Sequence, residues 1–480
     1  MTSMPWRQLL TEPRRPRRIR EYPRAPWLAV ATVCVGAFMG QLDASIVTVA
    51  LPNMRRELHV SVPAIEWVAL SYLLVLVGTV AAAGRLADMA GRKLLYTYGF
   101  LVFTAASLGC GMSGSLGVLI GMRVLQAVGA AMLQANSIAL IRTTVRPEHF
   151  HRAIGVQGAA QALGLASGPA IGGLLVAAAG WRSIFYANLP AGAVGILLAW
   201  LLLPRTRERA ARARFDWPGL ATLLPASAAL LLALSLLARR TGPVSVVALL
   251  AGSAVLFATF ASLEHRRTAP LIDMGLFTER AFAVGISGGL VAQLILFGVL
   301  FVTPLYLEDA YLLPAGAAGL TLTVLPLGLG LAAPVGARAA QRFGTRSATV
   351  TGMAMVAVAL PAALVVPMDR GVLIAALALT GMGLGLFISA NNSTVAGSGR
   401  REDAGMVSGV MNMTRGIGTA LGVAVAGACY ALASPAIGRI SRGQATMGFR
   451  AALVLLELLT LVAALLAIAA GPRKVSNLSI

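Results

Sequence analysis

Three ionisable side chains lie deep inside otherwise apolar segments, and their chemistry is that of proton transfer. Asp43, Arg123 and Glu457 each lie roughly 11–15 Å from the end of a predicted helix, at 1.5 Å per residue. A charge at mid-membrane costs on the order of 3 kcal/mol, so such residues normally face a cavity or one another. Burial favours a neutral carboxyl group and a nearby arginine favours the carboxylate, so an acid that moves between those environments can load and release a proton.

We therefore expect Asp43 to be the main proton carrier and Arg123 to be the partner that modulates it. Glu457 is a second candidate carrier in the last apolar segment. Two alternatives stay open: Asp43 as a purely structural hydrogen-bonding acid, and Glu457 as a protonated packing residue. Arg415, the other arginine within an apolar segment, lies nearer the inner end of its segment.

A charged stretch, residues 84–93, separates two long apolar runs and indicates a boundary with water. Its glycines permit tight turns at helix ends. Asp88 can bind the positive N-terminus of a neighbouring helix or pair with an arginine, and such a bond would bias the equilibrium between two conformations. A solvated loop that only fixes topology is the alternative. The residues of this predicted gating loop are Gly84, Arg85, Asp88, Gly91, Arg92 and Lys93.

A weaker copy of this stretch occupies residues 337–346, and it predicts a chain of two similar halves. When the copies are aligned, Gly91 meets Gly344, which lies 253 residues further on, whereas Asp88 meets Gln341. Each half of six helices spans roughly 180–190 residues at the predicted boundaries, and the surplus of about 65 residues fits one additional helix pair. We therefore predict an order of six, two and six helices.

Glycines recur at every fourth position in a segment near residue 164, so they form one smooth helix face against which another helix can pack closely. A proline within the segment removes one backbone hydrogen bond and can kink the helix. Ordinary tight packing is the alternative to a functional role. The residues are Gly164, Gly168, Pro169, Gly172 and Gly173.

Amide side chains within the apolar segments are candidate groups of a substrate cavity. Buried amides in lipid also bond neighbouring helices, so each of them has a structural alternative. The candidate residues are Gln41, Gln134, Asn136, Gln157, Gln161, Asn391 and Asn412, and Gln293 and Asn392 have a similar placement.

These side chains are positioned by a chain that reads as an all-α integral membrane protein. Hydrophobic residues make up 58% and charged residues 12%, against about 25% charged in soluble domains. The apolar runs are continuous and do not alternate with polar residues, which favours helices over a barrel. About fourteen spans are predicted near residues 27–52, 64–83, 94–112, 116–141, 153–179, 183–203, 216–238, 243–263, 281–307, 314–336, 347–366, 371–395, 404–431 and 447–470.

The distribution of positive charge predicts that both termini lie in the cytoplasm. At these boundaries the inner segments hold 28 of the 39 lysines and arginines and the outer loops hold 9, although Arg239, Arg240, Arg439, Arg442 and Arg450 run against this bias. The predicted divisions are a basic cytoplasmic tail (1–26), a first six-helix bundle (27–203), linkers with accessory helices seven and eight (204–280), a second six-helix bundle (281–470) and a cytoplasmic tail (471–480).

The sequence lacks the residues that several classes of protein function require. The three cysteines fall inside apolar segments without metal-ligand spacing, so we expect no metal and no cofactor. The only lysines, Lys93 and Lys474, each follow an arginine, which excludes the phosphate-binding lysine loop of an ATP-driven pump. We find no nucleophile constellation and expect no enzyme. The net charge of +21 is explained by topology, so no nucleic-acid partner is expected.

Four segments in order carry a resemblance to a known family: residues 42–52, 84–93, 123–129 and 162–173. They resemble the first-helix, loop, fourth-helix and fifth-helix motifs of the major facilitator superfamily, and within it the fourteen-helix drug:proton antiporters. The resemblance implies the superfamily's fold and a fifth helix that restricts leak. Met89 and Ala127 depart from the usual motif residues, which puts details of gating in doubt.

We therefore expect a secondary active exporter that exchanges protons for small amphipathic compounds, either drug-like or endogenous, by alternating access. An uncoupled facilitator, or an exporter of one specific metabolite, amino acid or lipid, is the alternative. The expected partners are the substrate, protons and the lipid bilayer of the plasma or bacterial inner membrane, and the expected state is a monomer.

Overall fold

The computed structural model describes residues 12, 15–206, 217–238, 243–265, 274–365, 369–396, 404–433 and 440–469. The predicted tail 471–480 lies outside the described residues, as do parts of the tail 1–26 and of the linkers in 204–280. The side chains of Arg85 and Asp88 are outside them as well.

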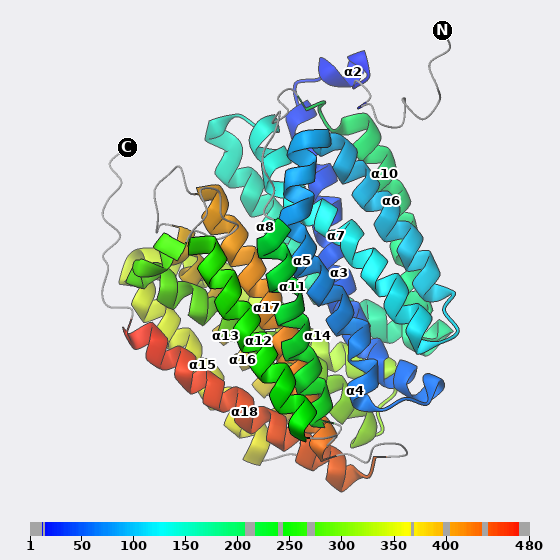
Figure 1. The fold of residues 1–480 in the computed structure, drawn as a ribbon, viewed down its shortest axis with the longest axis vertical. Helices are drawn as coiled ribbons and strands as arrows, with labels where there is room; N and C mark the ends of the chain where they lie inside the picture. Colours follow the sequence, from blue (N-terminus) through cyan, green and yellow to red (C-terminus); the bar gives the residue numbers. More distant parts are fainter. Residues whose placement is uncertain are drawn as a thin grey trace.

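All regular elements in the described ranges are helices, as the sequence predicts, and the long ones fall into two groups (Figure 1). The first group comprises α3 (Ala25–Leu58), α5 (Trp67–Ala90), α6 (Arg92–Gly111), α7 (Leu116–Thr144), α8 (Phe150–Ala179) and α10 (Asn188–Leu202). The second group comprises α13 (Arg280–Asp309), α14 (Ala315–Phe343), α15 (Thr345–Val365), α16 (Arg370–Ala396), α17 (Ala404–Leu432) and α18 (Arg442–Ala469). Short helices α2 (Arg17–Arg20), α4 (Val62–Ile65) and α9 (Ser183–Tyr186) flank the first group.

The same pattern of helix packing occurs within each of the two groups. In the first group α3 packs on α8, α5 on α7 and α6 on α7; in the second, α13 packs on α17, α14 on α16 and α15 on α16. The groups meet where α8 packs on α14 and where α5 packs on α17. The duplicated packing follows the duplicated loop motif, because the two sequence halves present similar apolar faces.

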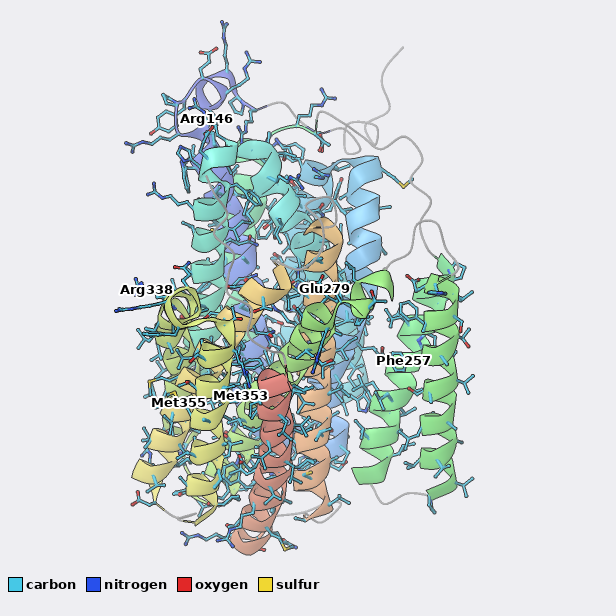
Figure 2. The ribbon with its side chains drawn as sticks, turned by 90° about the vertical axis from the view of Figure 1, so that its left-hand side faces the viewer. Arg146, Phe257, Glu279, Arg338, Met353 and Met355 are labelled. Carbon is cyan, nitrogen blue, oxygen red and sulfur yellow. The ribbon has the colours of Figure 1, made fainter. Side chains whose placement is uncertain are left out.

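Two further helices, α11 (Trp217–Ala238) and α12 (Pro243–His265), lie between the two groups in the sequence. They pack on each other. The Ser253 hydroxyl donates to the Ala226 carbonyl at 2.8 Å across this pair. In Figure 1 the pair crosses in front of the boundary between the groups, and in Figure 2 it stands at one side of the molecule, near the labelled Phe257. The α11 helix contacts both α5 and α17, and Trp67 donates to Ser235 at 3.2 Å.

Thirteen of the described helical segments are long and apolar enough to cross a membrane. The fourteenth predicted span corresponds to α11, whose apolar stretch Ala221–Leu236 is shorter. Hydroxyl groups inside the spans mostly donate to carbonyls of the preceding turn, as Thr32 does to Leu28 at 3.0 Å, so they add no unsatisfied polar group to the apolar helices.

The repeated loop motif ends its helix in the same way in both halves. Gly91 follows α5 with a φ of 118°, and Gly344 follows α14 with a φ of 90°. Both values lie in the left-handed region that side chains rarely adopt, so glycine is required there. The prediction of a turn at Gly84 is wrong, because α5 continues through it to Ala90.

Candidate functional site

Asp43 and Arg123 form a buried ion pair inside the first group of helices. The Arg123 Nη1 atom lies 2.6 Å from Asp43 Oδ2, and both side chains are essentially inaccessible, at 1% and 0% exposure. Asp43 lies in the middle of α3, whereas Arg123 comes from α7. A buried charge of this kind is tolerated only if its remaining hydrogen-bonding capacity is also used.

Neutral groups on neighbouring helices donate hydrogen bonds to Oδ1, the carboxylate oxygen of Asp43 that does not pair with Arg123 Nη1. Gln126 donates to Asp43 Oδ1 at 2.9 Å, and Asn188, at the start of α10, donates to the same oxygen at 3.1 Å. The Gln126 amide lies 2.8 Å from the Ser107 hydroxyl of α6. The sequence analysis did not single out Gln126, Asn188 or Ser107, although an amide one turn from Arg123 was a readable signal.

The guanidinium is held from its other side by α5. Arg123 Nε donates to the Val68 carbonyl at 2.9 Å, and its Nη1 also donates to Gln126 Oε1 at 2.7 Å. The guanidinium carbon stacks 4.2 Å from the centre of the Tyr72 ring. These contacts fix the position of Arg123 on the side that does not bind Asp43. Tyr72 also lines the cavity between the two groups of helices.

Beyond Tyr72 lies a cavity of about 530 Å³ between the two groups of helices. This volume falls within the range that holds a drug-sized molecule. Apolar and aromatic side chains, including Tyr72, Phe103 and Phe297, supply much of its wall. Its polar lining residues are Gln41, Gln134, Ser137, Gln161, Gln293, Ser389, Asn392, Asn412, Arg415 and Thr419.

The predicted amides divide between the cavity wall and helix packing. Gln41, Gln134, Gln161 and Asn412 line the cavity. Other predicted amides are placed differently: Asn136 donates to the Met132 carbonyl in its own helix, Asn391 donates to the Gly285 carbonyl of α13, and Gln157 is a buried residue of α8.

Helix α8 is pressed against the part of α3 that carries Asp43. A Cβ atom at Gly172 would lie 2.7 Å from the Ile46 side chain, one at Gly164 would lie 3.2 Å from Gln41 Cβ, and one at Gly168 would collide with Ser45. Gly173 faces the other group instead, where a Cβ would lie 3.1 Å from the Gly319 Cα of α14. The helix runs on through Pro169 without a break in its assignment.

Ion pairs join the two groups at the end of the molecule that lies at the C-terminus of α3. Arg55 lies 2.7 Å from Asp309, and Arg56 lies 2.5 Å from Glu308. Tyr430 donates to Asp309 at 3.0 Å. These pairs link α3 to α13, and the sequence analysis did not predict them.

At the opposite end the gating-loop stretch is tied to the N-terminal tail. Glu12 accepts hydrogen bonds from the Thr206 hydroxyl and the Thr206 backbone N–H, each at 2.7 Å, and from the Leu94 N–H at 3.4 Å. Arg92 N–H donates to the Thr206 hydroxyl at 2.9 Å, and Lys93 is fully buried nearby. The tail therefore occupies the N-terminus of α6, where a carboxylate is favoured.

Glu457 lies on α18, apart from the Asp43–Arg123 pair. One of its carboxyl oxygens is buried without a hydrogen-bond partner among the described residues. No group of three or more metal-ligating side chains occurs in the described part of the chain.

Two packed groups of apolar helices around a central cavity with both apolar and polar lining residues are typical of a membrane transporter. The chain belongs to the Major Facilitator Superfamily, whose family model matches residues 33–306 and 281–479. It is therefore a transporter and not an enzyme, and the predicted fold class is confirmed.

Similar proteins agree with this assignment. The riboflavin transporter RibZ of Clostridioides difficile is 32% identical over 83% of this chain and 87% of its own length. The tetracenomycin C resistance and export protein of Streptomyces glaucescens is 30% identical over 85% of this chain and 76% of its own. A crystal structure of a bacterial homologue of the lysosomal transporter Spinster, inward-facing and unoccupied, matches with a TM-score of 0.67 at 15% identity, covering 94% of this chain and 97% of that one.

Proposed function

We propose that this protein is a secondary active exporter that exchanges small amphipathic compounds for protons by alternating access. The observation that carries the proposal is the Asp43–Arg123 pair, which is buried and separated from the substrate cavity by one aromatic ring. Drug-resistance and vitamin transporters among its relatives support a small organic substrate.

In this proposal, protonation of Asp43 removes one charge of the pair. Arg123 then keeps its bonds to the Val68 carbonyl and Gln126, together with its contact to Tyr72. Because Tyr72 also lines the cavity, a shift of the guanidinium toward or away from α3 changes the wall that the substrate touches. The cavity can thus bind substrate differently in the two protonation states, which is what coupling requires.

We assign the described conformation to the inward-open state, in a cell membrane with both termini in the cytoplasm. The positive-inside distribution of lysines and arginines supports this orientation. The ion pairs Arg55–Asp309 and Arg56–Glu308 then close the outer side. The loop 84–93 would in turn gate the inner side when the groups close there.

Transport in inverted membrane vesicles with an imposed pH gradient tests the proposal. Vesicles that contain the wild-type protein should concentrate riboflavin or a fluorescent drug when ΔpH is imposed. Asp43→Asn should abolish this uptake and still bind the compound, because the substitution keeps the shape of the side chain and removes its titration. Glu57→Gln, which removes an acid from an ion pair in the same helix, is the matched control.

Two outcomes would refute the coupling. Asp43→Asn that still concentrates substrate on ΔpH alone would show that Asp43 is not the carrier. Wild-type transport that only equilibrates the compound and ignores ΔpH would identify an uncoupled facilitator.

A further inference from the structure

The cavity contains a positive charge that no described residue neutralises. Arg415 is the only charged side chain among the described residues that line it. No described residue pairs with Arg415 or accepts a hydrogen bond from its guanidinium. This differs from Arg123, whose charge is paired with Asp43 and whose Nε and Nη1 atoms donate to Val68, Gln126 and Asp43.

Arg415 belongs to a polar face of α17 that points into the cavity. Asn412, Arg415, Gly416 and Thr419 all line it and are spaced three and four residues apart, which places them on one side of a helix. The helix is held there because Gly418 packs on α13, where a Cβ would lie 3.1 Å from the Gln293 side chain. The guanidinium is thus positioned by backbone packing and not by an acid.

A second polar atom in the same wall also lacks a partner. Gln293 Oε1 is buried and has no hydrogen-bond partner among the described residues. A buried amide oxygen left unbonded costs about 1–3 kcal/mol, so a rotation of the Gln293 side chain that brings this oxygen to a ligand donor would recover that loss. As described, the cavity offers one cation beside the aromatic side chains Tyr72, Phe103 and Phe297.

We propose that the substrates of this cavity are organic anions with a planar ring, and that Arg415 binds their acidic group. This inference rests on the proposed transport function and narrows its substrate class. A guanidinium binds a carboxylate, phosphate or ionised phenol through directed, charge-assisted hydrogen bonds. A lone positive charge within low-dielectric walls also raises the local concentration of anions and repels cations.

Two xanthene dyes of opposite charge provide the probe, because fluorescein is an anion and rhodamine 6G is a cation on the same ring system. Fluorescence anisotropy with the purified full-length protein in a neutral detergent gives both affinities without any need for transport. We expect the wild type to bind fluorescein more tightly than rhodamine 6G. We expect Arg415→Gln to weaken fluorescein at least tenfold and to leave rhodamine 6G unchanged or tighter, whereas Arg415→Lys keeps most of the fluorescein affinity.

Arg338→Gln is the matched control, because it removes the same charge from an exposed side chain that points away from the molecule in Figure 2. A wild type that prefers rhodamine 6G, or that fails to bind fluorescein, would overturn the proposal. An unchanged ratio of the two affinities in Arg415→Gln would do the same. If Arg415→Gln does not fold, the ratio of the two dye affinities of the wild type still tests the proposed substrate class.

Failure of the proposed function has a different signature. Vesicles that show no ΔpH-driven uptake, together with an Arg415-dependent dye preference, would reject proton-coupled export and leave the substrate class standing. Robust ΔpH-driven transport with a dye preference that ignores Arg415 would reject only the substrate class.

Discussion

At the residue scale, the ion pair depends on groups that do not titrate themselves. Gln126 and Asn188 converge on one oxygen of Asp43, whereas Arg123 takes the other. Neutral donors use the hydrogen-bonding capacity of the carboxylate that Arg123 leaves free, as a buried charge requires.

Because both charges are buried, we expect their substitutions to be strongly non-additive. Asp43→Asn or Arg123→Gln alone leaves an uncompensated polar site, with a loss of about 3–5 kcal/mol for a fully buried pair. The double variant should recover about 1–3 kcal/mol relative to the sum of the single losses. Thermal unfolding of the three purified variants in detergent measures this, and additive losses would contradict a direct interaction.

Residue counting along two helices was sufficient to predict that Asp43 and Arg123 lie at a similar depth. It did not predict Gln126 or Asn188 as partners, because an amide in an apolar helix fits a cavity wall, a packing contact and a charge network equally well. Asn136 and Asn391 show the same ambiguity, since both bond backbone carbonyls. Only the rotation and tilt of each helix, which follow from packing, separate these roles.

At the element scale, the contact of α3 with α8 sets the position of the site. Glycines remove the side chains that would separate these helices, so the α3 segment that carries Asp43 is supported from behind. The pairing of α13 with α17 repeats this arrangement beside Gln293 and Arg415. Each half therefore places a buried or cavity-lining polar side chain next to a glycine-lined helix contact.

A larger residue in place of one glycine of α8 tests how tightly α8 packs against α3. Gly168→Ala should destabilise the protein by roughly 1–3 kcal/mol, because its methyl group would collide with Ser45 and there is no space to absorb it. Gly155→Ala lies on the same helix with open space around its Cβ position and should be neutral or slightly stabilising. Unfolding midpoints in detergent report the difference, and equal midpoints would show that the contact is loose.

The glycine spacing in α8 predicted a close helix contact, but the pattern carries no information about the partner. Gly84 shows the opposite error, since a glycine in a charged stretch suggested a turn where the helix continues. The backbone at Gly91 and Gly344 does require glycine. Composition alone does not distinguish a glycine needed for its φ angle from one that happens to lie in a helix.

At the scale of the whole molecule, the two groups are joined at one end by ion pairs between α3 and α13. Asp309 is engaged by both Arg55 and Tyr430, and Glu308 is engaged by Arg56 and lies 3.4 Å from the Asn53 amide. The pairing could not be predicted from the sequence, because it links residues about 250 positions apart.

Neutralising these acids should shift the conformational equilibrium toward the state that opens at this end. Glu308→Gln with Asp309→Asn should raise the population of that state at least about fivefold, the lower range of typical coupling energies. Spin labels at Gly114 and Leu312, in a background without the three cysteines, measure the separation of the groups. Glu57→Gln breaks an ion pair at the same end but within one group, so it should leave the spin-label distances unchanged. If the distances also change in Glu57→Gln, the effect comes from a general loss of charge and not from the pairs between the groups.

The bonds of Glu12 have a consequence for the order in which the protein is made. Glu12 leaves the ribosome 194 residues before Thr206, its partner beyond the sixth long helix. The bonds between Glu12 and Thr206 therefore form only after all six helices of the first half have been synthesised, whereas the bond from the Leu94 N–H can form earlier. The Thr206 bonds thus mark the completion of that half, and a bulky fusion placed directly before Glu12 would interfere with this last step of assembly.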